Sequence, residues 1–467
     1  MVYTFGGPRV SSITIQVAAT LVANLGILNT GMMIGFPSVL LPPLLKVGPG
    51  LHISFDQATW LSSISFISAP VGCVVAGPMI DRVGRRRGLV LLNLTFIAGW
   101  LPSAVFPLSL PALYVGRICS GIGAGAAPSA CSIYTAEVAA VYLRTALVLI
   151  TPLMLSVGAV ITYLWAMLYQ ESWSEVSWFG LSVTSMSLVL TLLLPESPMW
   201  LLNRGHAEKA LQALQRLRGA SGPEQVKEEL DSFSSRASDK QQKTSWLSNF
   251  KHLRKPQVYK PLIMINALYL CGNFSGVMPV MSFAVDFTNR AGIQGEAHYV
   301  AMCIAIVRMV SILIFTWVSN VFGSRNPAVF FGVIMTASMT MLTVNVSGLL
   351  VLPQWLIGAL VLVYVYAGST SFTNIMLSML GEVFPTEVRG FASGITTGLG
   401  FTTSFVATKL YPIFVTEFEA YFVFLFFTIF GAAGTLYIYF FLPETHGKTL
   451  LEIEDHFKGV QTTGTKL

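Results

Sequence analysis

The sequence predicts an all-α membrane protein with twelve transmembrane helices arranged as two six-helix bundles. Hydrophobic residues make up 54% of its 467 residues and charged residues only 11%, far below the roughly 25% typical of soluble domains. One long polar interval, from about Leu194 to Pro261, divides the chain into two hydrophobic blocks. Because about 20 apolar residues cross a bilayer, each block can hold about six spans with short loops.

Both hydrophobic blocks end on the same motif. Leu194-Pro195-Glu196-Ser197-Pro198 follows the first block, and Leu442-Pro443-Glu444-Thr445 follows the second. The predicted domains are therefore an N-terminal bundle (1–194), a cytoplasmic linker with short helices (195–261), a C-terminal bundle (262–442) and a cytoplasmic tail (443–467). Such an internal duplication predicts two halves related by an axis along the membrane normal.

The charge and cysteine patterns exclude several classes of protein. The net charge of +6 comes mainly from loops beside predicted spans, where basic residues set orientation rather than bind nucleic acid. The N-terminus lacks the features of a secretory signal, so we expect both termini to be cytoplasmic. All five cysteines fall in apolar runs, which indicates no disulfide framework or metal site. With no nucleophile and base set or phosphate loop outside the spans, we expect no enzyme activity and no cofactor.

In the N-terminal block, the first span is expected from about Ile13 to Gly35 and ends at Phe36-Pro37-Ser38. The second ends in the basic turn after Asp81, which the positive-inside bias places in the cytoplasm. The other spans of this half are expected at about Thr59–Pro78, Leu89–Val105, Ala112–Thr135, from Arg144 to Leu168, and at Trp178–Leu193.

In the polar interval, Ala207–Leu217 has the spacing of an amphipathic helix that lies under the bundle. The spans of the second block are expected at about Leu262–Phe283, Tyr299–Val318, Ala328–Leu342 and Leu356–Met379, with two more before Leu442. The loop Asn320–Arg325 is a weaker copy of the basic turn after the second span, which supports the duplication.

Five short motifs with charged residues follow one another along the chain. They are Asp81-Arg82-x-Gly84-Arg85-Arg86; Gly116-Arg117 with Tyr134-x-x-Glu137 and Arg144; Pro195-Glu196-Ser197-Pro198; Gly381-Glu382-x-x-Pro385-x-x-x-Arg389-Gly390; and Pro443-Glu444-Thr445-x-Gly447-Lys448. With these motifs the chain resembles the sugar-porter branch of the major facilitator superfamily over nearly its whole length. The run Ile34-Gly35-Phe36-Pro37-Ser38 and the loop lengths look most like insect facilitated trehalose and hexose transporters.

The resemblance implies a substrate cavity between the halves, rocking of one half against the other, and a cytoplasmic gate that pairs across the halves when the protein opens outward. In this scheme Glu196 and Glu444 are the bridging carboxylates. The implied gate residues are Asp81, Arg82, Arg85, Arg86, Glu137, Arg144, Glu196, Glu382, Arg389 and Glu444. The alternative is that these charges only anchor helix ends at the lipid headgroups.

The cavity departs from the family pattern. Where sugar porters carry Gln-Gln-Leu-Ser-Gly, this chain has Gly272-Asn273-Phe274-Ser275-Gly276, and the sugar-stacking tryptophan of the tenth span is absent. Because unpaired buried hydroxyls cost about 1 to 3 kcal/mol each, we expect weak hexose binding or another substrate. The candidate substrate-binding residues are Asn29, Thr30, Thr151, Asn273, Ser275, Arg308, Thr370, Thr373 and Asn374.

Arg308 is a charged residue at a membrane depth where charge is expensive. It lies twelve positions before Asn320, about 18 Å from the loop at 1.5 Å per residue, where arginine costs at least about 2.5 kcal/mol on insertion scales. It could contact a carboxylate, phosphate or sugar oxygen of a substrate. Alternatively, it could be a structural partner for backbone carbonyls or for Asp286.

The predicted function is facilitative transport of a sugar, trehalose or a hexose, by alternating access at the cell membrane. The first span has no carboxylate, which favours uniport, because proton-coupled relatives carry an aspartate there. Two alternatives stay open: transport of a different small solute, an anionic one included, and a sugar sensor without flux. The expected partners are a small-molecule substrate and the lipid bilayer, without nucleic acid, and the oligomeric state is left open.

Overall fold

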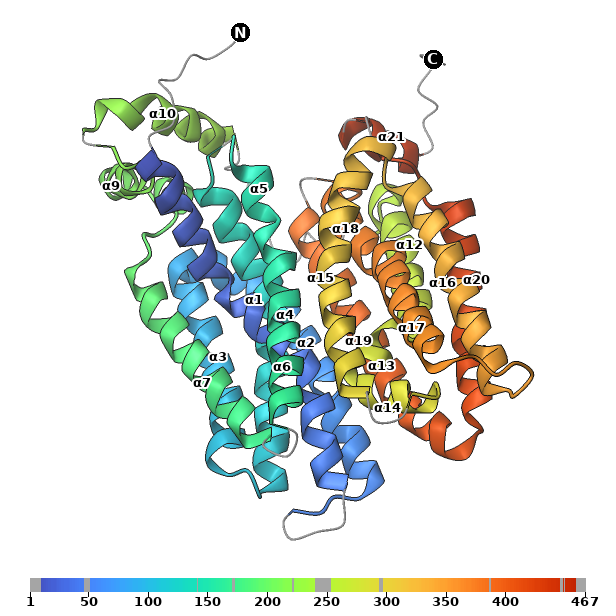
Figure 1. Cartoon of the computed structure of the whole chain (residues 1–467). Helices are drawn as coiled ribbons and strands as arrows, with labels where there is room; N and C mark the ends of the chain where they lie inside the picture. The colour runs from blue at the N-terminus through green and yellow to red at the C-terminus, as the bar shows by residue number, and fades with distance from the viewer. Residues whose placement is uncertain are drawn as a thin grey trace.

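The computed structural model describes residues 10–45, 51–140, 142–169, 173–220, 222–239, 253–293, 297–385, 388–445, 448 and 450–458. These residues form helices, turns and loops and no strand. Figure 1 shows two helical bundles side by side, one formed by the N-terminal half and one by the C-terminal half. The predicted all-α fold with two bundles is confirmed.

The bounds of the helices follow the order of the chain. The N-terminal bundle contains α1 (Val10–Leu45), α2 (Phe55–Val83), α3 (Arg85–Val105), α4 (Leu110–Val138), α5 (Arg144–Val148), α6 (Ile150–Leu168) and α7 (Trp173–Leu193). The linker contains α8 (Pro198–Asn203), α9 (Ala207–Arg218) and α10 (Glu224–Asp239). The C-terminal part contains α12 (Pro256–Phe274), α13 (Val277–Ser282), α14 (Ala284–Arg290), α15 (Ala297–Phe322), α16 (Arg325–Val346), α17 (Gln354–Gly368), η1 (Ser369–Asn374), α18 (Ile375–Glu382), α19 (Arg389–Glu417), α20 (Ala420–Phe441) and α21 (Leu450–Lys458).

Among the described residues, nine helical segments are long and apolar enough to span a membrane. Helices α4, α12 and α19 cross the bundles as well, which brings the number of crossings in the described residues to twelve. These three helices are less apolar because they contain many glycine, serine, threonine or asparagine residues. Large apolar side chains such as Trp317, Phe330 and Phe441 remain exposed on outer helices, as expected for surfaces that face lipid.

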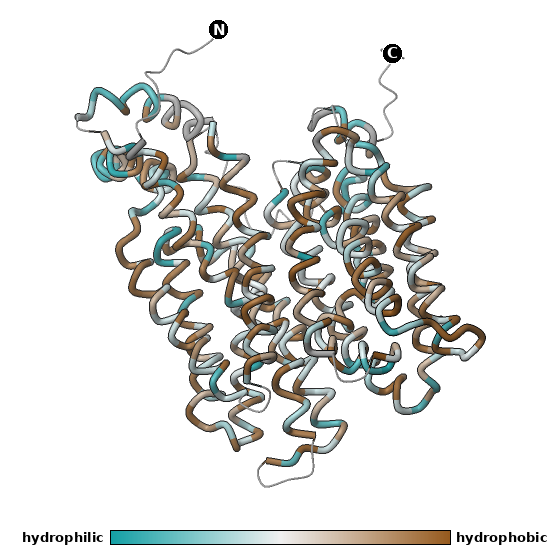
Figure 2. Tube along the Cα trace, viewed as in Figure 1, coloured by the Kyte–Doolittle hydropathy of each residue, from teal (hydrophilic) through white to brown (hydrophobic). Residues whose placement is uncertain are grey.

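The linker helices and α21 lie at one end of the molecule, which we call the linker end; the opposite end is the far end. Figures 1 and 2 show the start of α1 at the linker end, beside the hydrophilic helices α9 and α10. Helix α9 agrees with the amphipathic helix expected at Ala207–Leu217, because Ala210, Leu214 and Leu217 are buried.

The first span does not end at Phe36-Pro37-Ser38 as the sequence predicts. Helix α1 continues to Leu45 with Pro37, Pro42 and Pro43 inside it. Proline at position 37 removes the N–H that would bond the carbonyl of Met33, four residues earlier. Arg117 of α4 donates to that carbonyl instead, at 2.8 Å. A neighbouring helix thus supplies the missing donor, as membrane helices with internal proline require.

The seventh span is broken rather than continuous, and it begins earlier than expected, at Pro256. Helix α12 ends at Phe274, and Gly276 adopts φ +96° before α13 begins. A Cβ at Gly276 would lie 2.5 Å from the ring of Phe427, so both the conformation and the packing require glycine.

The tenth span contains a π-helical segment. It is η1, with the sequence Ser369-Thr370-Ser371-Phe372-Thr373-Asn374, between α17 and α18. Sequence periodicity does not predict this segment, because a π-helical turn adds one residue without a change in composition. Such segments are frequent at functional sites, and this one holds three of the candidate substrate-binding residues.

Close backbone contact joins α1 to α6. A Cβ at Gly158 would lie 2.0 Å from the carbonyl oxygen of Leu28, and a Cβ at Gly31 would lie 1.9 Å from that of Leu155. In lipid, helices associate through such van der Waals contact rather than through hydrophobicity. The two glycines therefore fix the approach of these two helices.

We predict that Gly158→Ala destabilises the protein by about 1 to 3 kcal/mol, the usual cost of overpacking, because the added methyl group must push the two backbones apart. The matched control is Gly77→Ala in α2, where a Cβ would meet nothing within 4 Å and helix propensity improves. Thermal melting of the detergent-purified protein measures both. Equal melting temperatures for the two variants would show that the close contact between α1 and α6 does not determine the stability of the protein.

Candidate functional site

The two halves meet through matching helix pairs. Helix α2 packs against α19, α6 packs against α15, and α1 contacts α13. The candidate site therefore has two parts: the junction between the halves, and the charged motifs at the linker end.

At the far end, charged and polar side chains join the halves directly. Lys409 of α19 forms an ion pair of 3.0 Å with Asp56, donates a hydrogen bond to Thr59, and lies 4.3 Å from the ring centroid of Trp60. All three partners belong to α2 in the other half. Sequence reasoning does not predict this contact, because it joins residues about 350 positions apart.

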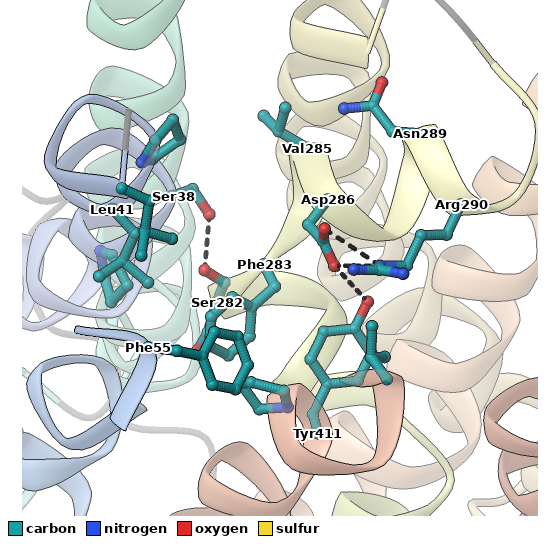
Figure 3. Close-up of a pocket in the computed structure, with 15 residues that line it drawn as sticks. Ser38, Leu41, Phe55, Ser282, Phe283, Val285, Asp286, Asn289, Arg290 and Tyr411 are labelled. Carbon is teal, nitrogen blue, oxygen red and sulfur yellow. Dashed lines mark hydrogen bonds and ion pairs between the residues drawn. The ribbon is translucent and has the colours of Figure 1, made fainter. Parts of the chain in front are cut away.

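The α1 and α13 junction adds further hydrogen bonds between the halves. Ser38 donates to the carbonyl of Ser282 at 2.9 Å, as Figure 3 shows, and Tyr163 of α6 donates to the carbonyl of Met281. A pocket of about 230 Å³ lies beside this junction. In its wall, Asp286 accepts hydrogen bonds from Tyr411 at 3.0 Å and from Arg290 at 2.9 Å (Figure 3).

At the linker end, the N-terminal half holds a compact charged cluster. Arg85 donates two hydrogen bonds to Glu137, at 2.8 and 2.9 Å, and pairs with Asp81 at 2.9 Å. Glu196 accepts from the backbone N–H groups of Arg85 and Arg86, at 2.8 and 3.0 Å. These groups open α3, so Glu196 caps the positive end of that helix.

The C-terminal half repeats this cluster with one change. Glu444 accepts from the N–H groups of Ser324 and Arg325, at 3.2 and 3.3 Å, at the start of α16. Thr445 donates to Glu382 at 2.6 Å, as Ser197 donates to Glu137. Ser324 stands where the first half has Arg85, so hydroxyl groups rather than a guanidinium hold the carboxylate of Glu382.

A glycine precedes the capped helix in both clusters. Gly84 and Gly323 have φ of +104° and +80°. A Cβ would lie 2.5 Å from the Glu196 carboxylate at the first glycine and 2.8 Å from the Glu444 carboxylate at the second. The glycine of each motif is therefore needed so that the carboxylate can reach the start of the helix.

In this conformation, Glu196 and Glu444 accept hydrogen bonds from backbone N–H groups of their own halves. Two arginines keep a buried nitrogen without a hydrogen-bond partner: Nε of Arg144 and Nη2 of Arg389. Arg82 contributes its backbone carbonyl, which accepts from Arg204. Pairing across the halves at this end therefore stays a prediction for another conformation.

Four candidate substrate-binding residues have their side chains engaged within the protein. Asn29 accepts from Trp100 at 3.0 Å and from Thr184 at 2.7 Å and donates to its own helix. The hydroxyls of Thr30, Ser275 and Thr370 donate to carbonyls three or four residues earlier. Helical serine and threonine often form such bonds, so these three hydroxyls have no proton left to donate to a ligand in this conformation and could only accept from one.

Other candidates keep polar atoms without partners. The hydroxyl of Thr151 is buried and unpaired. Asn273 donates to Thr403 at 2.8 Å and Asn374 donates to Ser311 at 3.5 Å, but neither amide oxygen accepts a hydrogen bond from a described residue. Thr373 of η1 is half-buried. These groups could bind substrate hydroxyls. Sequence reasoning missed Ser156, Ser282 and Ser369, whose buried hydroxyls also lack partners.

Arg308 lies near the middle of α15 and is only 4% exposed. No hydrogen bond or ion pair joins its guanidinium to any described residue. Asp286, one of its expected structural partners, is instead bound by Arg290 and Tyr411. In this conformation Arg308 does not pair with Asp286, and both interpretations of Arg308, as a ligand contact and as a structural partner, stay predictions.

Comparison with known proteins places the chain in a family. The family model described as "Sugar (and other) transporter" matches residues 18–457. The chain belongs to this family. Facilitated trehalose transporters of Bombyx mori and Polypedilum vanderplanki are 26% and 27% identical over 94% and 95% of this chain, and 86% and 88% of their own lengths are covered.

Solved structures of other transporters have the same fold as this protein. The xylose transporter XylE from E. coli, in an inward open conformation, matches 94% of this chain and 98% of its own with a TM-score of 0.76 at 21% identity. A second XylE structure, bound to 6-bromo-6-deoxy-D-glucose, matches 96% of this chain and 100% of its own with a TM-score of 0.74 at 21% identity. The predicted sugar-porter fold is thus confirmed.

We predict that Arg85→Ser, which copies the residue at position 324, lowers the free energy of unfolding by about 1 to 3 kcal/mol, because Glu137 loses two charge-assisted hydrogen bonds. The matched control is Arg87→Ser, two residues later, which removes the same charge from an exposed side chain. Chemical or thermal unfolding in detergent compares them. If both variants lose the same stability, net charge rather than the cluster is responsible.

Proposed function

We propose that this protein carries a sugar, trehalose or a hexose, across the cell membrane by facilitated diffusion with alternating access. The observation that carries the proposal is the arrangement of polar contacts in a member of the sugar (and other) transporter family. An ion pair and hydrogen bonds join the two halves at the far end, whereas the charged clusters at the linker end bond within each half. A transporter closed on one side and open on the other has this pattern.

The linker end is assigned to the cytoplasm. The basic turn at Arg85, Arg86 and Arg87 lies there, together with Arg204, Arg216 and Arg218 of the linker helices. Cytoplasmic loops carry such an excess of arginine and lysine. With this assignment both termini lie in the cytoplasm, and the conformation described here faces inward. The proposed domains are the N-terminal bundle (1–194), the cytoplasmic linker (195–261), the C-terminal bundle (262–442) and the cytoplasmic tail (443–467).

The contacts at the far end are weak enough to break in each transport cycle. The side chain of Asp56 is 76% exposed, and exposed ion pairs are worth about 0 to 1 kcal/mol. Closing the linker end would bring Arg144 and Arg389, each with an unpaired buried nitrogen, toward carboxylates of the opposite half. Exchanging one set of weak contacts for the other biases the equilibrium between the two states without locking either.

Facilitated diffusion, rather than proton coupling, is supported by the first helix. Helix α1, from Val10 to Leu45, contains no acidic residue, so it offers no carboxylate that could take up and release a proton. Trehalose and hexoses are favoured as substrates because relatives similar over 94% of the chain or more are named facilitated trehalose transporters.

The direct test is uptake of radiolabelled trehalose and D-glucose into proteoliposomes that contain the full chain. We expect saturable uptake of at least one sugar, unchanged by an imposed proton gradient, because α1 lacks a proton-accepting group. Protein-free liposomes give the background. Flux at the background level for both sugars would reject sugar transport, and uptake driven by an inward proton gradient would reject uniport.

We predict that Lys409→Gln shifts the protein toward the outward-facing state, because it removes the ion pair between the halves. The readout is labelling of a cysteine at position 282, a residue 0% exposed here, by a membrane-impermeant maleimide after replacement of the native cysteines. A loss of up to about 1 kcal/mol corresponds to up to about a fivefold faster labelling rate.

The matched control for this experiment is Arg290→Gln. Arg290 lines the same pocket as the labelled position 282. Because it pairs with Asp286 inside its own half, we expect no change in the labelling rate. The charge swap Asp56→Lys with Lys409→Asp should restore the original rate. An equal increase in the Arg290→Gln variant would contradict a specific role for Lys409 in closing the far end.

A further inference from the structure

Two membrane-embedded arginines of this protein have opposite surroundings. Arg117 of α4 is 2% exposed and donates to the carbonyls of Met33, Leu61 and Ser62 at 2.8 to 3.2 Å. Arg308 of α15 is 4% exposed, and no described residue accepts a hydrogen bond from it. The fold pairs one of its two buried arginines fully and leaves the other unpaired.

Arg308 lies where the two halves meet. Helix α15 packs against α6 of the N-terminal half, and the side chain of Arg308 lies near Tyr163 on that helix. Tyr163 in turn donates to the carbonyl of Met281 across the junction. A ligand bound at Arg308 would therefore contact a region that must rearrange when the halves move against each other.

Polar groups on the neighbouring π-helical segment lie close to Arg308. Ser311, one turn further along α15, donates to the backbone carbonyl of Arg308 at 2.7 Å and accepts from Asn374 at 3.5 Å. The amide oxygen of Asn374 remains without a partner, and Thr373 precedes it. The segment of α15 that carries Arg308 is thus accompanied by a hydrogen-bond acceptor and a hydroxyl of η1 that suit the hydroxyl groups of a polyol.

None of the ion pairs among the described residues includes Arg308, and two carboxylates near the junction, Asp56 and Asp286, are paired with Lys409 and Arg290. An anion for Arg308 can therefore come from a ligand. A phosphate monoester carries about −1.5 to −2 at neutral pH, which one guanidinium does not balance, whereas a single carboxylate matches it in charge and in two-bond geometry.

We propose that Arg308 recognises the carboxylate of a transported sugar acid, a small polyhydroxylated monocarboxylate such as a uronate. The proposal rests on the transport function proposed above and adds sugar acids to the substrates of the same site. The guanidinium holds the carboxylate by two parallel hydrogen bonds, and the polar groups of η1 hold hydroxyls of the sugar. Uniport of such a solute moves one negative charge across the membrane, whereas uniport of trehalose or D-glucose moves none.

The test uses the full chain in proteoliposomes with radiolabelled D-glucuronate and D-glucose. We expect saturable uptake of D-glucuronate, and an inside-positive diffusion potential of about 60 mV should accumulate it about tenfold without effect on D-glucose. In Arg308→Gln, D-glucuronate uptake should fall at least tenfold, and by a larger factor than D-glucose uptake. Arg308→Lys keeps the charge but loses the two-bond geometry, so it should lie between the two.

A stability measurement separates recognition from misfolding. Because Arg308 has no protein partner, Arg308→Gln should melt at the same or a higher temperature than the natural protein. D-glucuronate should raise the melting temperature of the natural protein and leave that of Arg308→Gln unchanged. A variant that melts at a lower temperature would show that Arg308 has a structural role and would overturn the proposal.

The outcomes distinguish this proposal from the transport function on which it rests. Saturable trehalose or D-glucose flux, with D-glucuronate neither carried nor stabilising, overturns sugar-acid recognition and leaves sugar transport in place. Equal D-glucuronate uptake by the natural protein and Arg308→Gln removes Arg308 as the recognition residue. If no solute crosses but D-glucuronate stabilises only the natural protein, transport fails and recognition stands; without that stabilisation, both fail.

Discussion

A bilayer offers no water to a buried polar group, so each such group must find its partner within the protein or within a ligand. This constraint accounts for the main features of the structure. Arg117 donates to the carbonyl that Pro37 leaves free, which lets α1 continue past this proline. Glu196 and Glu444 occupy the starts of α3 and α16, where helical N–H groups have no partners of their own.

The same constraint explains why the duplicated halves share their loops more closely than their interiors. The capping carboxylate, the glycine with positive φ and the adjacent hydroxyl recur in both halves, because all three are needed to begin a helix at that point. The guanidinium of Arg85 is not needed for this, and the second half has Ser324 instead. The two clusters therefore share a structural core but differ in charge, so the carboxylates of Glu137 and Glu382 are held with different strength.

The sequence predicted the helical class, the two halves, the linker helix at Ala207 and the motifs of the charged clusters, because hydropathy and motif order are properties of contiguous residues. It failed wherever a neighbouring helix decides the outcome. The prolines of α1, the break at Gly276 and the π-helical segment at Ser369 depend on packing partners far away in the chain. The expected pairing of Glu196 and Glu444 across the halves depends on the conformational state, which no motif encodes.

The candidate site shows the same limit at the level of single residues. Asn29 and Arg308 are both polar residues buried in predicted spans, and composition alone makes both candidates for ligand binding. Asn29 bonds Trp100, Thr184 and its own helix, so a ligand would have to displace protein contacts of equal quality. Arg308 has no such contacts to lose, so nearly all the energy of a bond to a ligand would be gained. Among buried polar groups, absence of a partner within the protein therefore separates a candidate binding residue from a structural one.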